Sequence, residues 1–230
     1  MTTRDGRSTR WDAHRAERRT RILNTAIDLI DSGTGWDTAS LCAAVPIARS
    51  ALYRIFPDQR ILENLIREAI VARLIQAVPT SVADGDTARS LVERSVDEYV
   101  DWVVRHPSLQ RYLSGTGTRS GLAVSAPVAA GRSAFVCMVS TKVAAALHLS
   151  APPDSPAYVA VQRGAHGIVG LLESTVIDFH LTRDRPPTTD ESLNAFLSAA
   201  VLGVIGAIAD IAAVPFDPDS LIDTEAGKLP

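Results

Sequence analysis

The densest concentration of reactive side chains in the sequence is the arginine at its N-terminal end. Residues 1–21 contain seven arginines against three acidic residues, although the whole chain of 230 residues carries a formal net charge of -3. Guanidinium groups form paired hydrogen bonds with phosphates and with guanine edges. A basic end on an acidic protein therefore favours a polyanion as the partner of that end, with a solvated tail as the alternative interpretation.

No other group of residues predicts a reaction or a metal site. Cys42 and Cys137 are far apart and lack zinc-ligand spacing, which fits free thiols in a reducing compartment. His166, Glu173 and His180 recur every seven residues, a separation of about 10.5 Å along a helix that is too long for one ion. We interpret them as polar groups of an interface or cavity. Nucleophile–base pairs, glycine-rich phosphate loops and HExxH motifs do not occur, so we expect no enzyme activity and no cofactor.

The elements that must position the arginines are helices. Nearly every segment repeats its apolar residues at three and four positions, and almost none alternates as a strand does. The sequence therefore predicts an all-α protein of about nine helices. Their expected ranges are about 11–32, 38–45, 48–55, 58–77, 87–105, 107–113, 127–149, 155–181 and 190–213.

We expect two domains. Residues 1–57 would form an N-terminal arm and a helix-turn-helix domain, and residues 58–230 a larger helical domain. The strongest break in the helical pattern is at residues 78–86, which are rich in Pro, Ser, Gly and Asp.

One apolar stretch has the length of a membrane span. Residues 195–214 are rich in Ala and Gly, contain Asp210, and lack basic and aromatic anchors on both sides. We therefore expect a tightly packed helix and no membrane partner. The N-terminal residues have charge but no apolar core behind it, so we expect no secretory signal and a cytoplasmic protein.

The helix-turn-helix is predicted at residues 37–56, which read DTASLCAAVPIARSALYRIF. Two short helices meet at a turn near Pro46 and bury a compact apolar set. Its members are Leu41, Val45, Ile47, Leu52 and Phe56. The pair is too small to be stable alone and needs the preceding and following helices as support. Its second helix fits a DNA major groove, which is about 12 Å wide.

Residues 21–62 resemble the N-terminal domain of the tetracycline-repressor (TetR) family. The resemblance covers under a fifth of the chain, and the LYR-x-F ending at residues 52–56 is its most specific part. The length and the closing pair of long helices also match the layout of that family. The matching residues are Ile22, Leu23, Ala26, Leu29, Gly33, Leu41, Cys42, Val45, Ile47, Leu52, Tyr53, Phe56 and Leu62.

The resemblance implies a transcriptional regulator, with repression the expected mode. It would bind a palindromic double-stranded DNA operator as a homodimer and respond to a small-molecule effector. Arg49 and Ser50 would meet bases or phosphates, and Tyr53 and Arg54 would contact phosphates. Thr38 would offer its hydroxyl or amide to the DNA backbone. Arginines upstream of the first helix's core would reach a phosphate or the minor groove; they are Arg15, Arg18 and Arg19.

The resemblance also predicts two sites in the larger domain. Small residues on the last two helices would allow close approach of a second copy, with packing inside one chain as the alternative. These residues are Gly164, Gly167, Gly170, Ala199, Gly203, Gly206 and Ala207. Aromatic, His and Met side chains would line an effector pocket, with plain core as the alternative. These residues are Tyr99, Trp102, His106, Tyr112, Phe135 and Met138.

Three departures from the family pattern suggest a second hypothesis for function. Pro46 stands where the family has a turn glycine, Ala48 where it has a capping serine, and Gln59 where it has a phosphate-binding lysine. These departures are compatible with a small-molecule-binding or protein-interaction module whose DNA-binding head has degenerated. A rotated or unwound recognition helix would favour that alternative.

Overall fold

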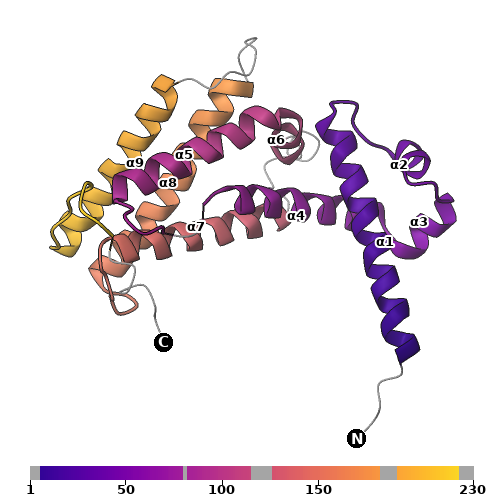
Figure 1. Ribbon diagram of the computed structural model, residues 1–230, viewed down its shortest axis with the longest axis horizontal. Helices are drawn as coiled ribbons and strands as arrows, with labels where there is room; N and C mark the ends of the chain where they lie inside the picture. The colour runs from indigo at the N-terminus through magenta and orange to yellow at the C-terminus, as the bar shows by residue number, and fades with distance from the viewer. Residues whose placement is uncertain (1–5, 80–81, 115–125, 182–190, 223–230) are drawn as a thin grey trace, which may run out of the picture. The chain divides into compact units, whose positions relative to one another are not determined.

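A computed structural model describes residues 6–79, 82–114, 126–181 and 191–222 of the chain. In these ranges nine helices follow one another (Figure 1). They are α1 (Gly6–Asp31), α2 (Thr38–Ala44), α3 (Arg49–Ile55), α4 (Gln59–Ala77), α5 (Ala88–Arg105), α6 (Pro107–Ser114), α7 (Ala126–Ala146), α8 (Pro156–Leu181) and α9 (Glu191–Ala212). The predicted all-α fold is confirmed. Helix α1 begins at Gly6, earlier than the start predicted near residue 11.

The helices pack as two compact units. Unit 1 comprises residues 1–71 and 108–128, and unit 2 comprises residues 72–107 and 129–230. Unit 1 therefore contains the helix-turn-helix together with most of α4 and with α6 from Ser108 on. The functional division predicted after residue 57 stays a prediction.

The core of unit 1 is the buried face of α1 with the helices it supports. Ile22, Ala26, Ile27 and Ile30 repeat at helical spacing and are buried. The helix then ends at Gly33, whose φ of 77° lies in the left-handed region that glycine adopts without strain.

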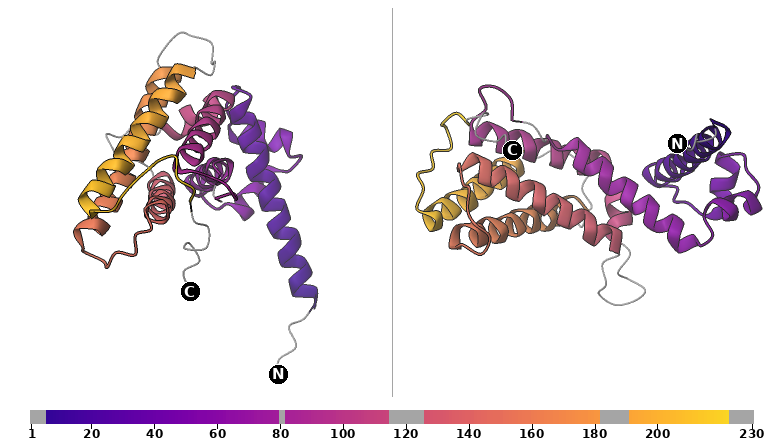
Figure 2. Two further views of the ribbon diagram at one scale, coloured as in Figure 1. Left: turned by 60° about the vertical axis from the view of Figure 1, so that its left-hand side comes forward. Right: turned by 90° about the horizontal axis from the view of Figure 1, so that it is seen from below.

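The core of unit 2 is built on α9, which packs against α8 and α5; Figures 1 and 2 agree in placing α8 and α9 side by side. Both α7 and α9 are long and apolar enough to cross a membrane by length and composition. In α9, however, Leu197, Val201 and Ile205 are buried against neighbouring helices, while Asp210 is exposed. One face of α9 thus packs in the core of unit 2, while other residues of the helix are exposed.

A network of hydrogen bonds fixes the start of α5. The buried carboxylate of Asp86 accepts hydrogen bonds from Arg94 Nη1 and Nη2 at 2.9 and 2.7 Å and from the Ala83 N–H at 2.7 Å. The bond from Arg94 is the main reason that the pKa of Asp86 lies well below its usual range. Thr87 and Ser90 add a capping box. This network orients the helix that forms one wall of the cavity described below.

Candidate nucleic-acid interface and effector cavity

Helices α2 and α3 form the predicted helix-turn-helix. Asp37 caps α2: its carboxylate accepts the Ser40 N–H at 2.7 Å, and its own N–H donates to Ser40 Oγ at 2.9 Å. Leu41, Leu52 and Phe56 are each at most 2% exposed, so the two helices are held by one small core. This core fixes which face of α3 points outward.

The outward face of α3 carries all four DNA-contact residues predicted on that helix. Arg49, Ser50, Tyr53 and Arg54 are exposed, and Tyr53 shows 45% of its surface. A Tyr this exposed is not needed as a core aromatic, so its hydroxyl is free to serve as a donor. Thr38, at the first turn of α2, is half-buried.

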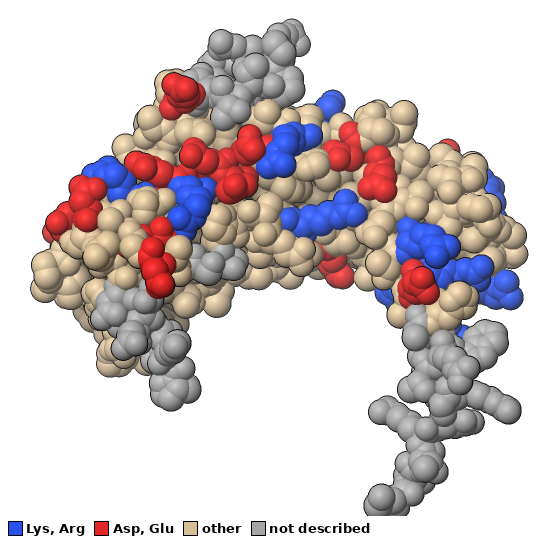
Figure 3. Space-filling view, viewed as in Figure 1, with Lys and Arg blue, Asp and Glu red and all other residues tan. Residues whose placement is uncertain are grey.

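A groove joins this face to α1. It has a volume of about 640 Å³ and lies between the exposed side of α1 and the end of α3. Its lining carries four arginines, which are Arg15, Arg18, Arg19 and Arg54. Blue side chains gather at this end of unit 1 in Figure 3. A groove with four guanidinium groups is electrostatically suited to a phosphate backbone.

Arg19 has a second contact. Its guanidinium carbon lies 5.4 Å from the centre of the Phe56 ring, which is within cation–π range. Phe56 closes α3, since its N–H donates to the Leu52 carbonyl at 2.8 Å. Arg19 therefore links α1 to the end of the recognition helix.

The turn between α2 and α3 forms without a glycine. Among the described residues, positive φ in unit 1 occurs only at Gly33 and Gly35, so neither Pro46 nor its neighbours use the left-handed region. Ala48 occupies the N-cap position of α3 with φ -69° and ψ 145°, and has no side chain to cap it. The recognition helix is nevertheless continuous over its seven residues.

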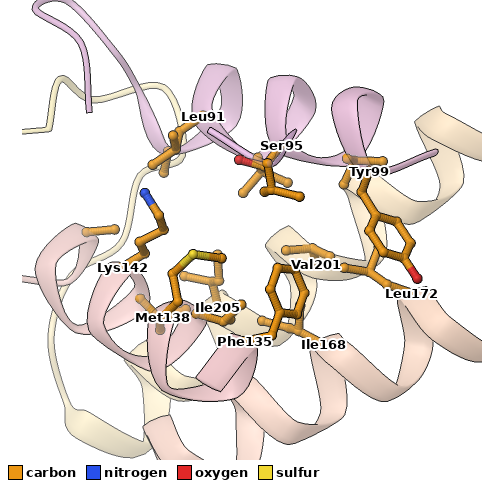
Figure 4. A pocket seen from close by; sticks show the side chains of 17 residues that line it. Leu91, Ser95, Tyr99, Phe135, Met138, Lys142, Ile168, Leu172, Val201 and Ile205 are labelled. Carbon is orange, nitrogen blue, oxygen red and sulfur yellow. The ribbon is translucent and has the colours of Figure 1, made fainter. Parts of the chain in front are cut away.

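Unit 2 contains an apolar cavity of about 90 Å³ (Figure 4). Helices α5, α7, α8 and α9 supply most of its walls, together with Val78 just after α4. The lining is mostly Val, Leu, Ile and Ala, and its polar side chains are Ser95, Tyr99 and Lys142. Figure 4 shows Tyr99 and Lys142 at opposite ends of the labelled set. Burial lowers the pKa of Lys142 and raises that of Tyr99.

The structure separates the predicted effector residues into three groups. Tyr99, Phe135 and Met138 line the cavity, and the rings of Tyr99 and Phe135 stack with centres 6.4 Å apart. Trp102 and His106 lie outside its lining and pack on each other, with ring centres 5.2 Å apart. Tyr112 lies in unit 1, against Arg67.

Sequence reasoning missed Lys142 and Ser95 as cavity residues. Ser95 is four residues before Tyr99, and Lys142 is four residues after Met138. Residues four apart lie on the same face of a helix, so each shares a face with a residue that was predicted to line the pocket. The spacing could have found them.

The predicted dimer residues differ in exposure. On α9, Ala199, Gly203 and Ala207 are exposed and share one face with Phe196 and Ile211, which are 56% and 61% exposed. On α8, Gly167 is exposed and a Cβ there would meet nothing within 4 Å, whereas one on Gly170 would lie 3.6 Å from Arg132 Nη2. Gly164 packs inside the chain, against Ile208.

The heptad-spaced polar residues of α8 have separate contacts. His166 is exposed, with Nδ1 2.8 Å from the Gln162 carbonyl oxygen. The Glu173 carboxylate lies 3.2 Å from Arg132 Nε, and burial raises the pKa of Glu173. His180 lies outside the residues whose side chains are described. The described His, Cys, Asp and Glu side chains form no metal-binding cluster.

The geometry defines a helical protein with a helix-turn-helix head, and solved structures share its fold. A TetR-family transcriptional regulator from Streptomyces coelicolor is 19% identical and superimposes with a TM-score of 0.66 over 86% of each chain. A possible TetR-family regulator from Streptomyces coelicolor A3(2) is 13% identical, with a TM-score of 0.51 over 84% of this chain and 99% of that one. The predicted resemblance is thus confirmed: the chain has the fold of the TetR-family transcriptional regulators.

Sequence comparisons agree over a shorter span. The nucleoid occlusion factor SlmA of Haemophilus influenzae is 26% identical over 102 residues, covering 43% of this chain and 47% of that protein. An uncharacterised HTH-type transcriptional regulator of Mycobacterium tuberculosis is 23% identical over 122 residues, or 50% of each chain. The chain thus spans about half the length of the curated relatives it matches. No family model matches the sequence.

Proposed function

We propose that this chain is a cytoplasmic DNA-binding transcriptional regulator, not an enzyme, that binds a palindromic operator as a homodimer. The observation that carries the proposal is the arginine-lined groove between α1 and α3, continuous with the exposed face of α3. In this proposal Arg49 and Ser50 read base edges, while Tyr53, Arg54, Arg18 and Arg19 hold phosphates.

The dimer would form through the exposed small-residue face of α9. This face carries two large apolar side chains, Phe196 and Ile211, beside three small residues, which are Ala199, Gly203 and Ala207. Such a face lets a second helix approach closely and bury apolar surface. A dimer is also what the mechanism requires, because two recognition helices must be about 34–36 Å apart to enter successive major grooves.

The effector would occupy the cavity of unit 2 and repression would be relieved when it binds. The nearly apolar lining favours a small apolar molecule, and the polar side chains of the lining are Ser95, Tyr99 and Lys142. Since coupling between two binding sites is reciprocal, effector and operator would weaken each other's affinity by the same factor.

The proposal is tested by fluorescence anisotropy with labelled duplexes covering the DNA that flanks the chain's own gene, at a fixed moderate salt concentration. We expect sequence-specific binding, which Arg49→Ala weakens by about 1–3 kcal/mol. Arg105→Ala is the matched control, since that arginine is exposed on α5 and pairs with Asp101 at 3.1 Å. Salt-dependent binding without sequence preference would instead support the degenerate-head hypothesis.

A further inference from the structure

A second pocket lies within unit 1 and differs chemically from the cavity of unit 2. Its volume is about 450 Å³, a size typical of small-molecule sites. The end of α1, the loop before α2, α4 and α6 supply its walls. The side chains that define its chemistry are Trp36, Glu63, Arg67, Ser108, Arg111 and Tyr112. None of them has a role in the DNA-binding proposal.

Arg67 is a buried charge with incomplete compensation. The residue is only 8% exposed. Its Nη2 lies 3.7 Å from the Glu63 carboxylate, its Nη1 donates to Asn64 Oδ1 at 3.4 Å, and its Nε has no hydrogen-bond partner among the described residues. A guanidinium has five N–H donors, and burying it is unfavourable unless they are paired. The Glu63 carboxylate, 3.7 Å from Nη2, leaves guanidinium N–H groups of Arg67 able to donate to a second anionic partner.

The neighbours of Arg67 are suited to an anion that carries a flat apolar group. The guanidinium carbon of Arg67 lies 5.2 Å from the centre of the Tyr112 ring, and the Trp36 indole is a second aromatic surface in the lining. The buried Tyr112 hydroxyl makes no hydrogen bond of ordinary geometry to the described residues. Burial raises the pKa of Tyr112, although the Trp36 indole is close enough to lower it somewhat, so this hydroxyl is a neutral donor.

Arg111 supplies a second positive charge at the exposed side of the pocket. Its Nη2 lies 3.5 Å from Ser108 Oγ. With Arg67 and Arg111 against Glu63, the charged side chains of the lining sum to one positive charge. The pocket therefore favours a monoanion over a neutral or cationic molecule.

We propose that this pocket binds a small carboxylate with a planar apolar body. Its carboxylate contacts Arg67 and Arg111, and its planar part packs on Trp36 and Tyr112. Guanidinium–carboxylate pairs are the strong, directional interactions that such a site needs. Because the ligand would contact the loop before α2 as well as α4 and α6, its binding would tie the support helices of the helix-turn-helix together.

Isothermal titration calorimetry on the full chain, with benzoate as the probe at fixed ionic strength, tests the proposal. We expect saturable binding of one benzoate per chain and at least tenfold weaker binding of the neutral isostere benzamide. Arg111→Gln should lower the benzoate affinity at least tenfold, whereas the control Arg105→Gln should leave it unchanged. Arg67→Lys keeps the charge but loses the planar fork, and should also weaken binding at least tenfold; a thermal melt checks that each variant is folded.

Two results would overturn the proposal. One is the absence of saturable benzoate binding, or equal affinities for benzoate and benzamide. The other is benzoate binding that survives both Arg111→Gln and Arg67→Lys but is lost in Val201→Phe, which would locate the ligand in the cavity of unit 2. Neither readout involves DNA, so failure here and failure of the proposed function are separate outcomes.

Discussion

Gly164→Ala tests whether α8 packs closely against α9 of the same chain at Gly164. A Cβ on Gly164 would overlap Cδ1 of Ile208 and lie 3.0 Å from its Cγ1 and 3.4 Å from Val204 Cγ1. Ile208 is only 3% exposed, so it has little room to move away. Overpacking of this kind destabilises by about 1–3 kcal/mol, while replacing Gly by Ala within a helix stabilises by about 1 kcal/mol. The net loss for the single variant is therefore about 0–2 kcal/mol.

A double-mutant cycle isolates the steric part. Ile208→Val removes the overlapping Cδ1 atom and by itself should destabilise by about 0.5–1.5 kcal/mol. In the Gly164→Ala background the same change also relieves the clash. The two substitutions together should therefore be more stable than the sum of the single effects, by about 1 kcal/mol.

The assay is urea unfolding followed by circular dichroism, with every variant at the same protein concentration. Gly203→Ala is the matched control for the coupling, because a Cβ there meets nothing within 4 Å inside the chain. Gly203 lies on the proposed dimer face, so the control compares only its coupling with Ile208→Val, from which a separate effect on association cancels. Coupling below about 0.3 kcal/mol between Gly164→Ala and Ile208→Val would refute the reasoning, since distant sites add to within that limit.

Three further predictions concern the other sites. Tyr53→Phe should weaken operator and non-operator binding alike, by about 0.5–1.5 kcal/mol in fluorescence anisotropy, because a phosphate hydrogen bond carries no sequence information; a loss confined to the operator would assign Tyr53 to base reading. Asp86→Asn should lower the free energy of unfolding at pH 7, measured by urea unfolding. The difference from the unaltered chain should shrink as the pH falls below about 3.8, the ordinary pKa of an Asp. The reason is that a carboxylate with a lowered pKa stabilises the fold above its ordinary pKa, and this stability is lost as the pH falls toward the lowered pKa. Benzene should raise the melting temperature by binding in the apolar cavity, and Val201→Phe should abolish that rise by filling it; an equal rise in Val201→Phe would place benzene elsewhere.

The helices and the outward face of α3 could be predicted because both follow from spacing within short segments. Leu52 and Phe56 are four residues apart and buried, so Tyr53 lies on another face wherever the helix packs. The same reasoning identifies Ile22, Ala26 and Ile30 as core. These positions need no knowledge of which distant segment covers them.

The effector pocket could be predicted only in part because it depends on contacts between distant segments. Helical spacing places Tyr99 and Trp102 on one side of the same helix, yet of these two only Tyr99 lines the cavity. Tyr112 is an aromatic residue on the next helix along the chain, yet it packs on Arg67 in unit 1. Helical period identifies which residues are buried, but it does not identify which of several cores receives them.

The turn between α2 and α3 shows why the departures from the family pattern leave the recognition helix intact. Proline disfavours a helical residue before it, and Val45 accordingly has φ -105° and ψ 88°. The Ile47 N–H still reaches the Cys42 carbonyl at 3.3 Å, so the chain turns with Pro46 in the bend and no positive φ. Proline limits the conformations of the unfolded chain, which favours folding by about 0.4–1 kcal/mol. This gain offsets much of the stability lost because Ala48 has no side chain to cap α3, a loss of about 1 kcal/mol. Two of the three residues that differ from the family pattern thus lie in the turn and cap, and the third, Gln59, begins α4. The exposed face of α3 keeps its two arginines and its tyrosine.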